Sequence, residues 1–305
     1  MSSKPENPTY DWIELGSLPS IGHSFLHNDD FLLADNFPEY IKDWANRPQA
    51  AGQEPYPVRI NFTLIVLCVK GSLTAMINLN SLSAESGNVI IANPGDLCLF
   101  QSASEDLQYL CIGIKNPSYF DPAGKEMTVD LRKLIIRHPL FFLNGKDTEA
   151  FISIYRLMGK KISEPDFPFK EDLIKNYLSV LSVYGRQWVA EQQAKHQSDS
   201  RQQELFNRFM EELNLYFREE HEVAFYADKL CITPKYMSQL IYQVSGHFAN
   251  EWIRDHIILE AKALLKSNKY TVLQVSEILN FPNPSFFSQY FKRTVGMTPR
   301  QYQQS

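Results

Sequence analysis

Two Ser-Gln pairs, Ser238-Gln239 and Ser288-Gln289, carry side chains suited to reading DNA bases. A glutamine amide can donate and accept at one base edge, and this geometry suits adenine in the major groove. Nearby lysine, arginine and tyrosine side chains can bind phosphate oxygens. Tyr242, Lys292 and Arg293 are expected at the phosphate backbone. The complete set of residues expected to contact DNA is Lys235, Ser238, Gln239, Tyr242, Ser285, Phe286, Ser288, Gln289, Lys292 and Arg293.

The second pair lies in a segment with both helix ends marked in the sequence. Asn283 is a good N-cap, and Pro284 falls at the first helical position, where its missing N–H costs nothing. Gly296 can take the left-handed conformation that ends a helix, and Pro299 prevents its continuation. The inner face is predicted to hold Phe287, Phe291 and Val295.

The same pattern occurs twice. Residues 233–246 align with residues 283–296 without a gap, and each copy runs from a cap residue and Pro to a terminal Gly. Apolar residues before each copy recur as well. The matched pairs are Val223 and Val272, Tyr226 and Val275, Ala227 and Ser276, and Leu230 and Leu279. This repeat predicts two helix-turn-helix units in tandem.

Helical spacing of apolar residues between the two units predicts a linking helix from about 248 to 267. Twenty residues at a rise of ~1.5 Å give a rod of about 30 Å. Successive major grooves on one face of DNA lie about 34 Å apart. The linking helix is therefore predicted to hold the two recognition helices in adjacent grooves.

Residues 201–302 resemble the DNA-binding domain of AraC/XylS-type transcription regulators, most specifically over 281–299. The resemblance implies double-stranded DNA and RNA polymerase as partners. Asn280 stands where that family usually has Gly, Ile257 where it has Arg, and Gln289 where Arg is frequent. Because Asn tolerates positive φ, the turn at Asn280 is predicted to form.

Short strands are predicted in the first part of the chain. Alternating apolar residues predict one strand over 58–68 that ends at Gly71 and a second over 73–79, and further strands are predicted at 89–91, 97–100 and 107–114. Strands and turns at this spacing are typical of a sandwich or small barrel. Residues 87–95 resemble the strand-turn signature of cupin barrels, the usual amino-terminal domain of sugar-responsive AraC-type proteins.

The barrel is expected to enclose a pocket for a small organic effector. Its inward residues are predicted to include Ile60, Phe62, Leu64 and Ile77. The alternative is a fully packed barrel that serves only dimerisation.

After the predicted barrel, the sequence shows apolar residues at helical spacing. Leu131, Leu134, Ile135 and Phe142 predict one helix, and Phe151, Ile154, Tyr155 and Met158 another. A third is predicted over 169–193, with Ile174, Tyr177, Leu181, Tyr184 and Trp188 at coiled-coil spacing. This seam fits either a homodimer or simple docking on the barrel. The family resemblance favours the homodimer, in which Leu181→Glu is expected to give a folded monomer.

Composition is that of a globular protein with 305 residues, 44% apolar and 21% charged. The formal charge of −5 is unevenly spread, because residues 223–305 hold nine Lys/Arg and five Asp/Glu, a balance of +4. The longest apolar run, 60–69, is too short to span a bilayer, and no signal peptide opens the chain, so a cytoplasmic protein without membrane contact is expected.

The sequence offers little catalytic chemistry. No histidine lies between His27 and His138, so the barrel strands lack imidazole ligands, and His23 and His27 have no evident third ligand nearby. The cysteines, 68, 98, 111 and 231, form no Cys-x-x-Cys pair and are expected to be buried free thiols. We therefore expect no enzyme activity, cofactor or metal. The alternatives are a metal-dependent cupin enzyme and a module that binds a partner protein.

The predicted fold is an α+β chain of two domains. Residues 1–195 form a cupin-like effector-binding and dimerisation domain, with a β-barrel at about 20–120 and flanking helices at about 126–193. A linker occupies 196–203. Residues 204–305 form an all-α AraC-type DNA-binding domain, with two helix-turn-helix motifs joined by a linker helix.

Overall fold

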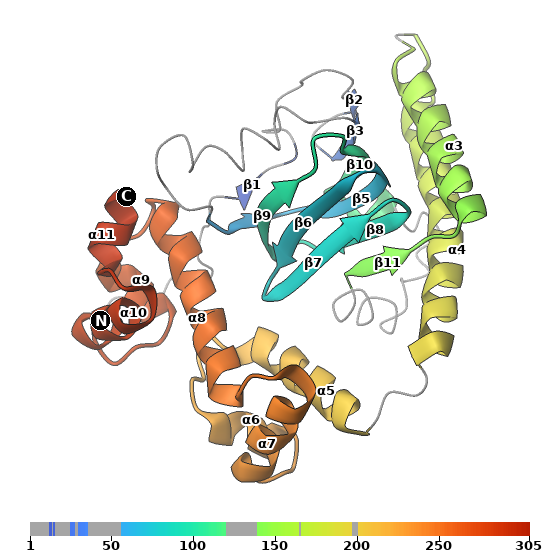
Figure 1. Cartoon of the computed structure of the whole chain (residues 1–305). Helices are drawn as coiled ribbons and strands as arrows, with labels where there is room; N and C mark the ends of the chain where they lie inside the picture. The colour runs from blue at the N-terminus through green and yellow to red at the C-terminus, as the bar shows by residue number, and fades with distance from the viewer. Residues whose placement is uncertain are drawn as a thin grey trace. The chain divides into compact units, whose positions relative to one another are not determined.

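The computed structural model describes residues 12–13, 15, 25–27, 30–35, 56–119, 139–164, 166–196 and 201–305. These residues form two compact units, one within 12–197 and one within 198–305, named here the N-terminal and C-terminal domains (Figure 1). Strands occur in the first and helices alone in the second. The predicted α+β class is confirmed in this form. Among the described residues, no helix is long and apolar enough to cross a membrane.

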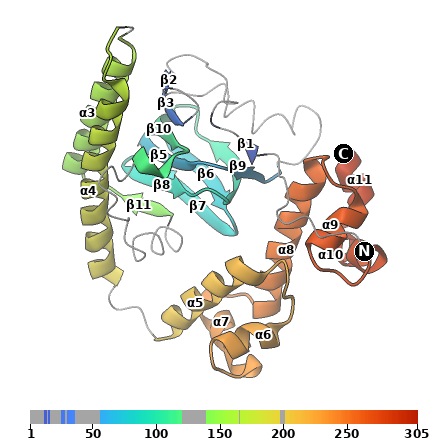
Figure 2. The ribbon, with the colours of Figure 1, turned by 180° about the vertical axis from the view of Figure 1, so that it is seen from behind.

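Two β-sheets make up most of the N-terminal domain (Figure 2). The five-stranded sheet has the order β1 (Trp12–Ile13), β4 (Val58–Ile60), β9 (Leu97–Ala103), β6 (Ser72–Ile77) and β7 (Asn80–Glu85). The six-stranded sheet has the order β11 (Leu140–Phe142), β8 (Asn88–Ala92), β5 (Thr63–Lys70), β10 (Gln108–Ile114), β3 (Phe31–Asp35) and β2 (Phe25–His27). Among the described strands, only β1 and β4 pair in parallel. The described strands do not close into a barrel.

The six-stranded sheet is buried on both faces, as β3 illustrates. Phe31 and Leu33 pack into one apolar cluster, whereas Leu32 and Ala34 pack into another. Successive side chains of a strand point to opposite faces, so one strand supplies both cores. The cluster between the sheets also takes up Ile60, Phe62, Leu64 and Ile77, the residues predicted to line a pocket. A ligand at this place would have to displace packed side chains.

Two predictions for this domain need correction, and one strand was not predicted. The strand predicted over 58–68 is two strands, because the chain bends at Asn61 and Phe62 and passes from one sheet to the other. Strand β7 was not predicted, because Leu82 and Ala84 are its only apolar residues and give a weak alternating pattern. Phe142 belongs to strand β11, not to a helix. The other residues of that predicted helix lie outside the described residues.

Helices α3 (Gly145–Ile162) and α4 (Lys170–His196) cover the outer face of the six-stranded sheet. One face of α4, here the inner stripe, packs against the sheet and α3. It consists of Ile174, Leu178, Leu181 and Trp188. Of the predicted seam, Ile174, Leu181 and Trp188 lie in this stripe, and Tyr177 and Tyr184 are partly buried against the same cluster. The spacing of the seam thus reflects docking on the domain's own core, the alternative that the sequence left open.

The C-terminal domain contains seven helices over its described residues, 201–305. They are α5 (Arg201–Tyr216), α6 (Val223–Lys229), α7 (Pro234–Ser245), α8 (Ala249–Lys266), α9 (Val272–Ile278), α10 (Pro284–Val295) and α11 (Pro299–Gln304). Helices α6 and α7 form the first helix-turn-helix unit, α9 and α10 the second, and α8 joins them. Residues 201–203, predicted as linker, begin α5, because Arg and Gln are good helix formers.

His256 is a polar side chain in the core of this domain, between α8 and α5. Its Nδ1 lies 3.0 Å from the Trp252 carbonyl oxygen, and its Nε2 lies 3.2 Å from the side-chain oxygen Oδ1 of Asn214. Burial lowers the pKa of His256 to about 4, and the Trp252 carbonyl, Asp255 and Glu260 oppose this change. The imidazole is therefore neutral at pH 7. Because a neutral ring has one N–H, it can donate a hydrogen bond to only one of these two oxygens.

This histidine should make the C-terminal domain sensitive to acid. Between pH 6.5 and 4 the unfolded chain protonates His256 and the folded chain does not, so the free energy of unfolding falls as pH falls. The His256 contribution is about 3 kcal/mol over this window. We expect His256→Gln to remove that part of the pH dependence and exposed His247→Gln to retain it. Hydrogen exchange of α8 at pH 7 and 4.5 measures both, and equal slopes would contradict the assignment.

Candidate DNA-binding surface

Helices α7 and α10 begin and end as their sequences predict. The Thr233 hydroxyl accepts a hydrogen bond from the Tyr236 N–H at 3.3 Å, and the Asn283 side chain accepts one from the Phe286 N–H at 2.8 Å. A proline follows each cap. Both helices end at a glycine with positive φ, 74° at position 246 and 88° at position 296. A left-handed glycine satisfies a terminal carbonyl without a Cβ clash.

The turns before α7 and α10 share a backbone conformation. Asn280 has a φ of 53°, as predicted, and Cys231 has a φ of 57° at the matching place in the first unit. Cys231 is exposed, contrary to the expectation of buried thiols; Cys68 and Cys111 are buried. Burial raises the pKa of Cys68 to about 11 and of Cys111 to about 12, so both thiols stay protonated.

The two helices bury two corresponding positions, Met237 with Phe287 and Ile241 with Phe291, and α7 also buries Leu240. Met237, Leu240 and Ile241 form the inner face of α7, and Phe287 and Phe291 form that of α10. Val295, predicted in the inner face, is half-buried. Outer faces correspond in the same way. Lys235, Gln239, Tyr242, Ser285, Phe286, Gln289, Lys292 and Arg293 are exposed, and Ser238 and Ser288 are half-buried.

The outer side chains are available for a ligand. Over residues 201–305 no hydrogen bond or ion pair engages the side chain of Gln239 or Gln289. Neither helix has an acidic residue in its first turn, and α10 ends with Lys292 and Arg293. Such surfaces attract the phosphate backbone of DNA.

Two aromatic features of this surface were missed from the sequence. Tyr236 occupies the position of Phe286 in the first unit and is similarly exposed. The internal repeat could have identified it, because the two segments align without a gap. Tyr242 stacks on exposed Phe248, with ring centroids 4.5 Å apart and planes 20° apart. This contact holds the tyrosine ring, so its hydroxyl is presented from a fixed position.

Within the described residues, no three side chains of His, Cys, Asp or Glu lie close enough together to hold a metal ion. His23 lies outside the described residues, as does the side chain of His27.

Residues 226–305 match a family model described as a helix-turn-helix domain. The C-terminal domain is of the AraC/XylS type. The chain is similar to the HTH-type transcriptional activator RhaR of Yersinia pestis, with 27% identity over 128 residues, which are 42% of this chain and 43% of the relative. It is also similar to the arabinose operon regulatory protein of Salmonella typhimurium, with 28% identity over 81 residues, 27% of this chain and 29% of that protein. The chain thus matches less than half the length of these relatives.

Among solved structures, the chain is similar to ToxT of Vibrio cholerae with a bound unsaturated fatty acid. The identity is 17% and the TM-score 0.39, with 82% of this chain and 89% of ToxT covered. It is also similar to the DNA-binding domain of AdpA in complex with a target DNA. There the identity is 19% and the TM-score 0.30, with 32% of this chain and 88% of that chain covered.

Proposed function

We propose that this protein is a sequence-specific DNA-binding transcription regulator. The observation that carries the proposal is the recurrence of one exposed polar face on α7 and α10, each backed by a buried stripe and closed by the same caps. Unrelated surface helices have no reason to repeat a pattern of Ser-Gln, cap and terminal glycine. A shared requirement, that each helix fits into a major groove, explains the repeat.

Gln239 and Gln289 are the proposed base readers. Both are exposed in the second turn of their helices, where a side chain can reach the floor of a major groove. Lys235 and Ser285 lie one turn earlier and support them, whereas half-buried Ser238 and Ser288 can contact only a base that comes close. Phe286 and Tyr236 suit an apolar contact with a thymine methyl group. Tyr242, Lys292 and Arg293 are the proposed phosphate contacts.

Helix α8 sets the separation of the readers in this proposal. Its 18 residues at ~1.5 Å per residue make about 27 Å, somewhat less than the ~34 Å between successive major grooves. Ile257, Ala261 and Leu264 of α8 are fully buried, so both helix-turn-helix units pack on it. Ile257 stands where similar domains usually have arginine, and here the side chain packs in the core.

The test is to select bound duplexes from a genomic library and to compare variants on them. Gln239→Ala and Gln289→Ala should each weaken specific binding by about 1–3 kcal/mol and leave non-specific binding nearly unchanged. Gln101→Ala, an exposed glutamine of the N-terminal domain, is the matched control. Affinity should also fall steeply between about 50 and 200 mM salt. The alternative, a module that binds a partner protein, would be favoured if binding does not change with salt concentration or if the selection yields no duplex.

The proposal includes a homodimer formed through the outer face of α4, here called the outer stripe. It consists of Leu173, Asn176, Val180 and Val183 of α4 together with Phe169, the residue directly before the helix, at spacings of four, three, four and three residues. At 3.6 residues per turn this stripe faces away from the inner stripe. Phe169, Val180 and Val183 are 63%, 45% and 55% exposed. Apolar residues at heptad spacing favour a partner helix of the same period.

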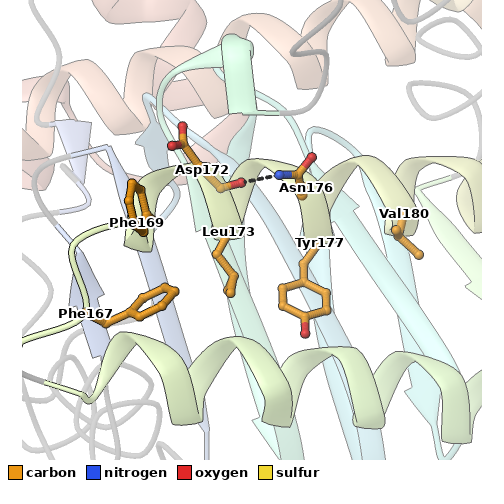
Figure 3. A pocket seen from close by; sticks show the side chains of 7 residues that line it. All are labelled: Phe167, Phe169, Asp172, Leu173, Asn176, Tyr177 and Val180. Carbon is orange, nitrogen blue, oxygen red and sulfur yellow. Dashed lines mark hydrogen bonds between the residues drawn. The ribbon is translucent and has the colours of Figure 1, made fainter.

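Asn176 argues for a second copy as the partner. A single asparagine in an apolar heptad seam sets the register and number of helices, because it pairs with its own counterpart. Among the described residues, its amide donates a hydrogen bond only to the Asp172 carbonyl of its own helix, at 2.8 Å. A groove of about 380 Å³ lies alongside, with Leu173 and Tyr177 directed toward the neighbouring helix (Figure 3). A partner's apolar side chain fits this groove.

Contact with RNA polymerase and an effector for the N-terminal domain remain predictions from the family resemblance.

A further inference from the structure

The segment after α5 contacts the turn of the second helix-turn-helix unit. The Asn280 side-chain amide donates a hydrogen bond to the Glu219 carbonyl oxygen at 2.8 Å. The His221 ring packs against Phe281, with ring centroids 4.9 Å apart. These contacts join residues about 60 positions apart in the chain and connect the first unit to the second away from α8.

Residues 217–222 are themselves fixed to the first unit and to α8. The Tyr226 hydroxyl of α6 donates to the Glu220 carbonyl at 2.7 Å. Arg218 Nε lies 2.9 Å from the Glu260 carboxylate of α8. Phe217 packs on His256, with ring centroids 5.8 Å apart. These contacts hold residues 217–222 in place against α6 and α8, so a turn that bonds to this segment is held in place as well.

The first unit shows that its equivalent turn needs no such bond. Cys231 has almost the same φ as Asn280, and over residues 201–305 no hydrogen bond engages its side chain. Asn280 therefore supplies more than tolerance of positive φ: its amide ties the turn to Glu219. Glycine, usual at this position in similar domains, would keep the turn and lose the bond.

We propose that Asn280 is a positioning residue that fixes the angle between the two helix-turn-helix units, and so the separation of the two DNA half-sites that the protein accepts. This rests on the proposed function. A single helix fixes distance along its own axis and leaves rotation about that axis and bending to other contacts. Asn280 lies three residues before the Asn283 cap of α10, so a displaced turn moves the start of that recognition helix.

The test uses the full chain with Asn280→Gly, and with Cys231→Gly as the matched control. Both changes place glycine at a left-handed turn position, and only the first removes a bond between the units. Each protein is bound to a duplex selected with the parent from a random library, and to the same duplex with one base pair added or deleted between the half-sites. Asn280→Gly should lower the preference for the parent spacing about three- to tenfold, the weight of one hydrogen bond. Cys231→Gly should retain it.

Hydrogen exchange without DNA separates failure of this inference from failure of the proposed function. Asn280→Gly should speed exchange about three- to tenfold in residues 219–222 and 279–283, and Cys231→Gly should leave both segments unchanged. Faster exchange with no selected duplex would support the contact and overturn the DNA-binding function. Unchanged exchange, or an unchanged spacing preference in Asn280→Gly, would overturn the positioning role.

Discussion

Replacing Leu181 by glutamate is expected to unfold the N-terminal domain. Leu181 is 7% exposed within the inner stripe, packed among side chains of α3 and the six-stranded sheet. A carboxylate there loses its hydration and gains no cation, and the side chain no longer fills its site. Destabilisation above about 4 kcal/mol belongs to this class of substitution. The sequence had instead predicted a folded monomer.

Val180→Glu is the matched control, because it introduces the same charge one residue away. Val180 lies on the outer stripe and is 45% exposed, so the domain should keep its fold while the proposed dimer dissociates. Circular dichroism on heating and sedimentation velocity distinguish the two effects. A folded, monomeric Leu181→Glu beside a dimeric Val180→Glu would restore the seam first predicted. A parent protein that sediments as a monomer would remove the dimer.

The α4 pattern shows why spacing alone could not choose between these outcomes. Apolar residues at three and four positions identify a buried helix face, but a partner helix and a sheet select the same spacing. The surface that covers this helix face is decided by contacts with strands about 60 to 155 residues away in the sequence, such as those of Leu33 and Ile112. Those contacts leave no mark in the local sequence.

Strand prediction failed for a related reason at residues 58–68. The alternation continues through Asn61 and Phe62, because the side chains on both sides of the bend still enter the core between the sheets. Only the hydrogen-bond partners change: β4 pairs with β9, and β5 with β8 and β10. Period-two patterning reports burial and carries no information about the partner strand.

The helix-turn-helix units were predictable because their signals are local. The caps Thr233 and Asn283, with the glycines at 246 and 296, fixed the limits of both recognition helices. Exposure of Gln239 and Gln289 followed from helical spacing. Cross-contacts such as Asn280 with Glu219 were beyond prediction, since the backbone carbonyl that accepts this bond carries no sequence signal.

Replacing Arg218 by methionine is expected to lower the free energy of unfolding of the C-terminal domain by about 3–5 kcal/mol. Arg218 pairs with Glu260, whose side chain is 0% exposed, while the arginine is 33% exposed. Removing the cation leaves the buried carboxylate without its ion pair, a much larger penalty than loss of a surface salt bridge. Methionine preserves most of the apolar stem, so packing changes little.

Two further variants separate charge from packing. Arg208→Met removes an exposed arginine from α5 and should change stability by no more than about 0.5 kcal/mol. Adding Glu260→Leu to Arg218→Met removes the uncompensated charge and should recover most of the loss, because a buried ion pair can often be exchanged for apolar residues at little cost. Urea denaturation of the full chain, followed by hydrogen exchange in α8, measures all three. If the double variant is no more stable than Arg218→Met, removal of the Glu260 charge has no effect. That result would show that Arg218 stabilises the domain by packing.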